Sequence, residues 1–282
     1  MQPSQPSRTA LGVARRRAAH QLFDSPIVFE DPLAVAMLGP DAEAGLRAEQ
    51  PKHRERFSTA LRAFVVARAR AAEDALAAAV ARGVAQFVVV GAGLDTFAYR
   101  NPFAGVRVFE VDHPATQEWK RDLLSAAGIA IPSSMTFAPV DFERQTLAEG
   151  LELAGLDAHA PALFSWLGVT MYLSDEALSS TLRFIASRPS GSGVVFDYAV
   201  ARESLGWIER LALSRLERRV AAVGEPFRTF FSPGGLRQRL IEDGFTAIDD
   251  LAADDLNAQY FANRRDSLHV SGGLGRLVIA WR

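Results

Sequence analysis

Two glycines, Gly91 and Gly93, directly follow the apolar and β-branched residues 87–90. A short apolar run that ends in glycine predicts a buried parallel strand followed by a tight strand-to-helix turn. Glycine has no Cβ and adopts positive φ, so a ligand can approach the backbone N–H groups of such a turn closely. The pattern therefore predicts a cofactor-binding turn at Gly91 and Gly93.

An acidic residue, Asp112, comes about twenty positions after these glycines, at the end of a second expected strand at residues 106–111. A carboxylate at this place can bind the ribose hydroxyls of a nucleoside. Alternatively, Asp112 is the N-cap of a helix that begins at Pro114. We favour ribose binding because the glycine turn and the acid occur together.

A second acid, Asp141, ends a third expected strand at residues 135–140 and is followed by Phe142. Its carboxylate can accept a hydrogen bond from the exocyclic amine of adenine, while the Phe142 ring or backbone contacts the base. The alternative is that Asp141 caps a helix at residues 143–153.

The glycine pattern departs from the dinucleotide fingerprint at Thr96, where the third glycine would stand. That glycine permits close packing of helix on strand, so binding of NAD becomes less favourable. No Gly-Lys-Ser/Thr sequence follows, which excludes a P-loop. A mononucleoside with a charged tail and no pyrophosphate fits best, and S-adenosylmethionine is such a cofactor.

A single arginine, Arg68, and an arginine triplet at residues 15–17 precede this turn. Arg68 lies beside an apolar stripe of an alanine-rich helix expected at residues 57–81, where it either extends to solvent or binds a carboxylate. An arginine triplet at residues 15–17 predicts a solvated helix face, although one of the three could bind an anionic substrate.

Composition narrows the remaining possibilities. The chain has 282 residues, a formal net charge of −2 and no cysteine. The charge disfavours nucleic acid as a partner, and the lack of cysteine excludes disulfides, thiolate nucleophiles and cysteine-ligated metal sites. No apolar run approaches the length of a membrane span. We expect a soluble, cytoplasmic protein that acts on small molecules, and its oligomeric state stays open.

The later part of the chain predicts two further strands at residues 162–167 and 193–198, then an insertion at about residues 201–235. Tyr172, after the first of these strands, either orients a substrate or is an ordinary half-buried tyrosine. Asp197, at the end of the second, has no assigned role. The insertion is either a substrate lid or core filler. Strands at residues 245–251 and 277–281, joined by a long polar connection without a helical crossover, predict an antiparallel pair.

The expected fold is thus α/β, a Rossmann-like doubly wound sheet in a single domain spanning residues 1–282. Residues 1–82 form an N-terminal helical cap, and residues 83–282 form the core with its late lid insertion.

Four segments, GAGLDTFAYR, FEVDHP, VDFE and SWLGVTMYL, together resemble the leucine carboxyl methyltransferase family of class I S-adenosylmethionine-dependent methyltransferases, in particular its bacterial small-molecule branch. The resemblance implies a seven-stranded, mostly parallel sheet with a reversed last strand. It implies that Arg68 pairs with the methionine carboxylate and that Gly91 and its neighbours contact the methionyl part. It also implies that Asp112 holds the ribose, and Asp141 with Phe142 the adenine.

One position departs from the family. Leu167 stands where the protein-modifying members have a glutamate, so a protein C-terminus is not assumed to be the substrate. Methyl transfer from a sulfonium is an in-line displacement that needs no metal. A carboxylate acceptor needs no base, a hydroxyl acceptor does, and we assign no catalytic base because His113 is better placed to support Asp112.

The primary hypothesis is an O-methyltransferase for a small carboxylic acid or hydroxyl compound. The alternatives are an NAD(P)-dependent reductase and a non-catalytic S-adenosylmethionine-binding protein.

Overall fold

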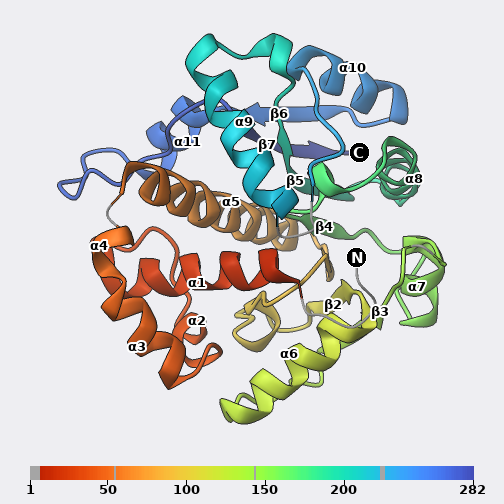
Figure 1. Ribbon diagram of the computed structural model, residues 1–282. Coiled ribbons are helices and arrows are strands. Elements are labelled where there is room, and N and C mark those ends of the chain that lie inside the picture. Colours follow the sequence, from red (N-terminus) through yellow and green to blue (C-terminus); the bar gives the residue numbers. More distant parts are fainter. Residues whose placement is uncertain (1–6, 54, 143, 223–225) are drawn as a thin grey trace.

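The computed structural model describes residues 7–53, 55–142, 144–222 and 226–282 (Figure 1). Its centre is a seven-stranded sheet in the order β3-β2-β1-β4-β5-β7-β6. The strands are β1 (Gln86–Val90), β2 (Arg107–Asp112), β3 (Met135–Pro139), β4 (Leu163–Trp166), β5 (Gly193–Ala199), β6 (Ala247–Leu251) and β7 (Gly275–Trp281). Among these strands β7 alone runs antiparallel to its neighbours, β5 and β6. The predicted mostly parallel sheet with a reversed last strand is confirmed.

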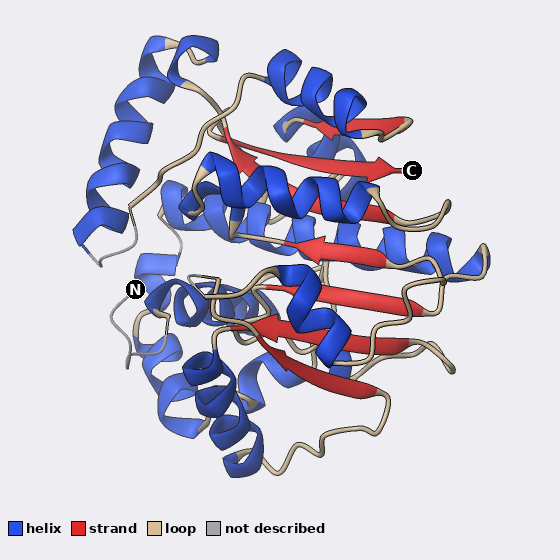
Figure 2. Ribbon diagram, turned by 90° about the vertical axis from the view of Figure 1, so that its right-hand side faces the viewer, coloured by secondary structure: helices blue, strands red, loops and turns tan. Residues whose placement is uncertain are grey.

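Helices pack on both faces of the sheet (Figure 2). Helices α5 (Arg56–Ala81), α6 (Pro114–Ala126) and α11 (Ala253–Tyr260) cover one face, and α7 (Leu147–Leu153), α8 (Asp175–Ala186) and α10 (Pro233–Asp243) cover the other. The central strands β1 and β4 are buried on both sides because alternate residues enter two cores. Phe87 and Val89 of β1 pack with α5, whereas Val88 and Val90 belong to the core beneath α8.

Two connections differ from the expectation. Residues 91–106 contain a single 3₁₀ turn, η1 (Phe97–Tyr99), in place of the α-helix expected after the glycines. Asp95 closes this connection locally, since its Oδ1 accepts the Phe97 N–H at 2.8 Å. The connection between β6 and β7 contains α11, so the expectation that it lacks a helix is wrong.

In the described part of the chain before α5 lie the helices α1 (Arg8–Phe23), α2 (Leu33–Ala36), α3 (Pro40–Ala48) and α4 (Gln50–His53). Figure 1 shows α1 lying beside α5. Within the expected cap, α5 packs directly on the sheet and contributes Ala63, Ala67 and Leu76 to the core. Helices α1 to α4 therefore attach to the sheet largely through α5 and through the loop after β1.

The late insertion contains η3 (Arg202–Ser204) and α9 (Trp207–Ala222) and returns through residues 226–231. The return is anchored beside β5, because the Ala201 and Phe231 N–H groups donate to Phe231 O and Ala199 O. No helix among the described residues is long and apolar enough to cross a membrane.

Candidate functional site

The glycine turn lies against two other segments. Gly91 and Gly93 have φ values of 67° and 48°, which glycine adopts without strain. A Cβ on Gly91 would lie 2.4 Å from Cγ2 of Val169, and one on Gly93 would lie 3.0 Å from Cβ of Ala10. Both positions therefore require glycine, because α1 and the loop after β4 approach the turn closely.

Asp112 connects the end of β2 to this turn. Its Oδ2 accepts the Gly93 N–H at 2.6 Å, and its Oδ1 accepts the His113 N–H at 2.7 Å. Burial raises the pKa of the Asp112 carboxyl, although both hydrogen bonds favour the charged form. Asp112 is not a helix cap, because the N-cap of α6 is His113, whose Nδ1 accepts the Ala115 N–H.

Asp141 and Phe142 follow β3 at the same edge of the sheet. The Val140 N–H donates to Asp112 O at 2.9 Å, which places the ends of β2 and β3 side by side. The helix-cap alternative for Asp141 is also wrong, because the N-cap of α7 is Thr146. The Phe142 side chain is 38% exposed. The structure therefore brings two acids and an exposed aromatic ring to neighbouring strand ends.

Arg68 is buried and paired. Its Nη1 donates to Oδ2 of Asp197 at 2.5 Å, and Oδ1 of Asp197 accepts the Gly168 N–H at 2.6 Å. Extension of Arg68 to solvent is therefore wrong, since its guanidinium binds a carboxylate of the protein itself. The role of Asp197, left open by the sequence, is to supply that carboxylate.

The arginine triplet of α1 is not a solvated face. Arg17 is 4% exposed and its Nη1 lies 3.0 Å from Oδ2 of Asp95, in the loop after the glycines. Arg16 is half-buried, and its Nη1 donates to Gly12 O at 2.7 Å, but its buried Nε has no hydrogen-bond partner among the described residues. Burial lowers the pKa of the Arg16 guanidinium, and the nearby charges of Arg68 and Arg62 lower it further. Spacing in the sequence does not distinguish Arg16 from its neighbours Arg15 and Arg17, so its environment is known from the structure alone.

Thr96, which replaces the third glycine of the dinucleotide pattern, is a buried polar hub. Its Oγ1 donates to Oδ1 of Asp31 at 2.7 Å and accepts from Nη2 of Arg17 at 2.6 Å. The side chain thus joins the loop after the glycines to the N-terminal helices. A hydroxyl is required here, whereas a glycine would leave both partners with one hydrogen bond fewer.

Tyr172 ends η2 (Thr170–Tyr172), the turn after β4. Its ring is half-buried and lies 5.4 Å from the ring of Phe227, which in turn lies 6.0 Å from that of Phe230. The Arg228 N–H donates to Met171 O at 2.7 Å, so the return of the insertion is fixed to η2. The insertion therefore supplies aromatic side chains next to Tyr172, and Phe227, Phe230 and Phe231 also pack against the core beneath α8.

Leu167, at the position of the family glutamate, packs against the core beneath α5. It offers no acceptor to a ligand. Among the described residues, Asp112 and Asp141 lie at this edge, and Asp197 is already bonded to Arg68 and Gly168.

Comparison with known proteins shows the family to which the chain is similar. The profile of the leucine carboxyl methyltransferase family matches residues 10–186. The chain is 31% identical over 294 aligned positions to YktD of Bacillus subtilis (strain 168), with 95% of each chain covered. It is 30% identical to a protein of Frankia alni, covering 81% of this chain and 91% of that one. The names of both relatives assign them provisionally to the S-adenosyl-L-methionine-dependent methyltransferases.

Solved structures share the fold. A methyltransferase, provisionally so named, from Thermobifida fusca superposes with a TM-score of 0.58 at 18% identity, covering 88% of this chain and 92% of that one. A DUF574 family protein from Streptomyces avermitilis gives a TM-score of 0.58 at 17% identity, with coverage of 87% and 94%. At these identities the likeness concerns the fold alone.

Proposed function

The chain belongs to the leucine carboxyl methyltransferase family of S-adenosylmethionine-dependent methyltransferases, and from this premise we propose that it methylates an oxygen of a small-molecule carboxylate or hydroxyl acceptor. The protein is therefore an enzyme that uses S-adenosylmethionine. The nicotinamide-dependent reductase considered from the glycine turn is wrong. We also propose that the protein acts in the cytoplasm, and the roles proposed for individual residues follow below.

The proposed cofactor residues lie together at the carboxyl ends of β1, β2 and β3. Asp112 would bind the ribose hydroxyls, Asp141 and Phe142 the adenine, and Gly91 and Gly93 the methionyl part. This proposal is supported by the adjacency of the β2 and β3 ends, which the bond from Val140 N–H to Asp112 O maintains. Carboxylates accept hydrogen bonds from hydroxyls and amines, so the side chains present fit a nucleoside.

Arg68 would hold the methionine carboxylate. Its Nη1 is used by Asp197, but its Nη2 faces Gly168, where a Cβ would lie only 2.8 Å away. Glycine is therefore needed at position 168 for the loop after β4 to pack on the Arg68 guanidinium. The proposed pairing with the cofactor is supported by the place of Arg68 at the carboxyl edge of the sheet, where Asp197 holds it.

The observation that carries the choice of acceptor is the Nε of Arg16. A buried guanidinium nitrogen without a partner is costly, and an anionic ligand removes that cost. Arg16 interacts electrostatically with Arg68 and Tyr172, so an anion bound to it would lie near the aromatic rings of the insertion. These contacts favour a carboxylic acid with an apolar body over an uncharged alcohol.

The mechanism then requires little acid–base chemistry from the protein. S-adenosylmethionine supplies an electrophilic methyl group on a sulfonium. A carboxylate acceptor would take this methyl group without losing a proton, so the residues of the site would not have to supply a general base. The task of Arg16 is to orient the carboxylate, and that of α1 and residues 226–231 is to exclude water.

The test uses S-adenosylmethionine with a labelled methyl group and a panel of small carboxylic acids, each matched with the corresponding primary alcohol. A methyl ester releases volatile labelled methanol in alkali, whereas a methyl ether does not. We expect base-labile label with acids that carry an apolar body. Labelled product from the alcohols alone would overturn the preference for carboxylates, and label retained on protein would overturn the small-molecule acceptor.

A further inference from the structure

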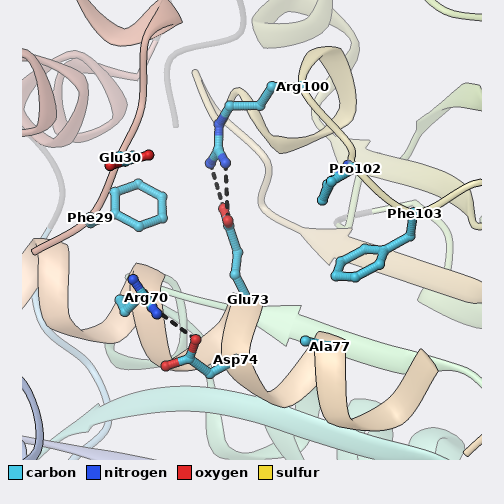
Figure 3. Close-up of a pocket in the computed structure, with 9 residues that line it drawn as sticks. All are labelled: Phe29, Glu30, Arg70, Glu73, Asp74, Ala77, Arg100, Pro102 and Phe103. Atoms are coloured by element: carbon cyan, nitrogen blue, oxygen red, sulfur yellow. Dashed lines mark hydrogen bonds and ion pairs between the residues drawn. The ribbon is translucent and has the colours of Figure 1, made fainter. Parts of the chain in front are cut away.

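A cavity of about 300 Å³ lies between helix α5, the loop after α1 and the connection between β1 and β2 (Figure 3). None of the residues proposed above for the cofactor or acceptor lines it. Its volume is at the lower end of the range in which small organic molecules bind. The cavity is therefore a candidate for a second binding site.

The guanidiniums at this cavity are already paired. Arg100 forms a two-armed ion pair with Glu73, in which Nη1 and Oε2 are 3.0 Å apart. Nε of Arg70 donates to Oδ1 of Asp74 at 2.8 Å, and the Tyr260 hydroxyl donates to Oδ2 of the same carboxylate at 3.0 Å. These contacts neutralise the two arginines, so the cavity offers little attraction to an anion.

Glu30 remains uncompensated. Its side chain is exposed and lines the cavity, and no hydrogen bond or ion pair to its carboxylate occurs in the described ranges of the chain. The lining thus has one carboxylate more than it has guanidiniums. This excess negative charge favours a cationic occupant.

Aromatic rings stand on two sides of the cavity. Figure 3 shows Phe29 and Glu30 on one side and Phe103 on the other, with the Arg100–Glu73 pair between them. Phe29 is only 1% exposed, and its ring is already covered by the Arg100 guanidinium, 5.0 Å from its centroid. Phe103 is partly exposed and is the ring that a ligand can reach. Aromatic rings attract cations and apolar stems pack on them, so Phe103 suits the same class of ligand as Glu30.

We propose that this cavity binds a small organic cation, an ammonium or guanidinium group on a short apolar stem. Its charge lies at Glu30 and its stem packs against Phe103 and Ala77. The site is connected to the cofactor turn, since Nε of Arg100 lies 3.2 Å from Oγ1 of Thr96. The proposal does not depend on the identity of the methyl acceptor.

The test is titration of the full-length protein with n-pentylamine at low ionic strength, followed by amide chemical shifts. At neutral pH this probe is a pentylammonium ion, and 1-pentanol and pentanoate are its neutral and anionic counterparts. We expect saturable binding of pentylammonium alone, with a dissociation constant of about 1 mM. The largest shift changes are expected at Glu30 and Phe103.

Two variants locate the site. Glu30→Gln should weaken pentylammonium binding about fivefold, the loss of one exposed ion pair, and Phe103→Leu should weaken it while keeping the apolar volume. Glu43→Gln, which removes an exposed carboxylate of α3 paired with Arg47, is the matched control and should bind as the wild type does. Equal binding by Glu30→Gln and wild type, tighter binding of pentanoate, or no saturation with pentylammonium would overturn the proposal.

Discussion

The Nη1 atom of Arg68 and the Oδ2 atom of Asp197 are 2.5 Å apart in an ion pair whose side chains are 8% and 1% exposed. The pair joins α5 to the end of β5 and holds Arg68 at the carboxyl edge of the sheet. Removal of one partner of a buried pair leaves a desolvated charge without compensation.

Asp197→Asn should therefore lower the free energy of unfolding by about 3–5 kcal/mol. Urea unfolding followed by circular dichroism measures this change. Glu43→Gln removes a carboxylate from a far more exposed ion pair and should cost less than about 1 kcal/mol. If the two variants lost similar amounts of unfolding free energy, Arg68 would not be left as a buried charge without a partner in Asp197→Asn.

Thr96→Val keeps the shape of the side chain and removes the hydroxyl that joins Asp31 and Arg17. The free energy of unfolding should fall by about 1–3 kcal/mol, because buried charged groups lose a hydrogen bond. Thr96→Ser retains the hydroxyl and loses the methyl group, so it is the control for a change at this position that keeps the hydrogen bonds. The hub role of Thr96 requires the valine variant to be clearly less stable than the serine variant in urea.

Much of this architecture follows from local sequence. The apolar runs at residues 87–90 and 193–198 predict buried strands because strands covered on both faces contain few polar residues. The glycines, Asp112 and Asp141 could be found because each terminates such a run. Local pattern also indicated an insertion after β5, although its contact with Tyr172 is known from the structure alone.

Other features depend on contacts between distant segments. Arg68 and Asp197 are separated by 129 positions, and no periodicity links them. Arg17 looked like part of a solvated triplet, although its partners Asp31 and Asp95 lie in two other loops. The helix expected after the glycines is absent from residues 91–106, since Asp95 closes a tight turn that glycine spacing does not reveal.

Stability should also depend on pH through Glu110 of β2. Nζ of Lys120 lies 2.6 Å from its Oε2, yet burial raises the pKa of Glu110 to about 7. The carboxyl therefore binds its proton more tightly in the folded state than in the unfolded state, where the pKa is about 4.3. Its contribution to stability is fully present below the unfolded value and is lost as the pH rises to 7.

Urea unfolding at several pH values between 4.5 and 7.5 measures the free energy of unfolding, which should fall as the contribution of Glu110 is lost. The double variant Glu110→Gln/Lys120→Met removes the titrating group without leaving a buried lysine unpaired. Its stability should fall less across this range than that of the wild type. If the free energy of unfolding of the wild type rose more than that of the double variant between pH 4.5 and 7, the pKa of Glu110 would be lowered by folding, which contradicts this prediction.

Arg16 should show a trade between stability and activity. Arg16→Met removes a buried Nε that has no partner in the described chain, so the free energy of unfolding should rise by about 1 kcal/mol. The same variant should raise KM for a carboxylate acceptor about tenfold or more, because a charge-assisted hydrogen bond is lost.

Arg15→Met is the matched control, since Arg15 pairs with Glu49 at 2.9 Å and is partly exposed. It should change neither the KM for the acceptor nor the affinity for S-adenosylmethionine appreciably. If Arg16→Met weakened the cofactor and left the acceptor KM unchanged, Arg16 would belong to the cofactor site instead.

The most direct test of the proposed cofactor site is calorimetric titration of S-adenosylmethionine into the wild type, Asp112→Asn and the control Asp122→Asn, an exposed acid of α6. Loss of a carboxylate that accepts hydrogen bonds from ribose costs about 1.5–3 kcal/mol. We expect saturable binding to the wild type and to Asp122→Asn, and at least about tenfold weaker binding to a folded Asp112→Asn. Equal affinities for all three proteins would contradict the assignment of Asp112 to the cofactor.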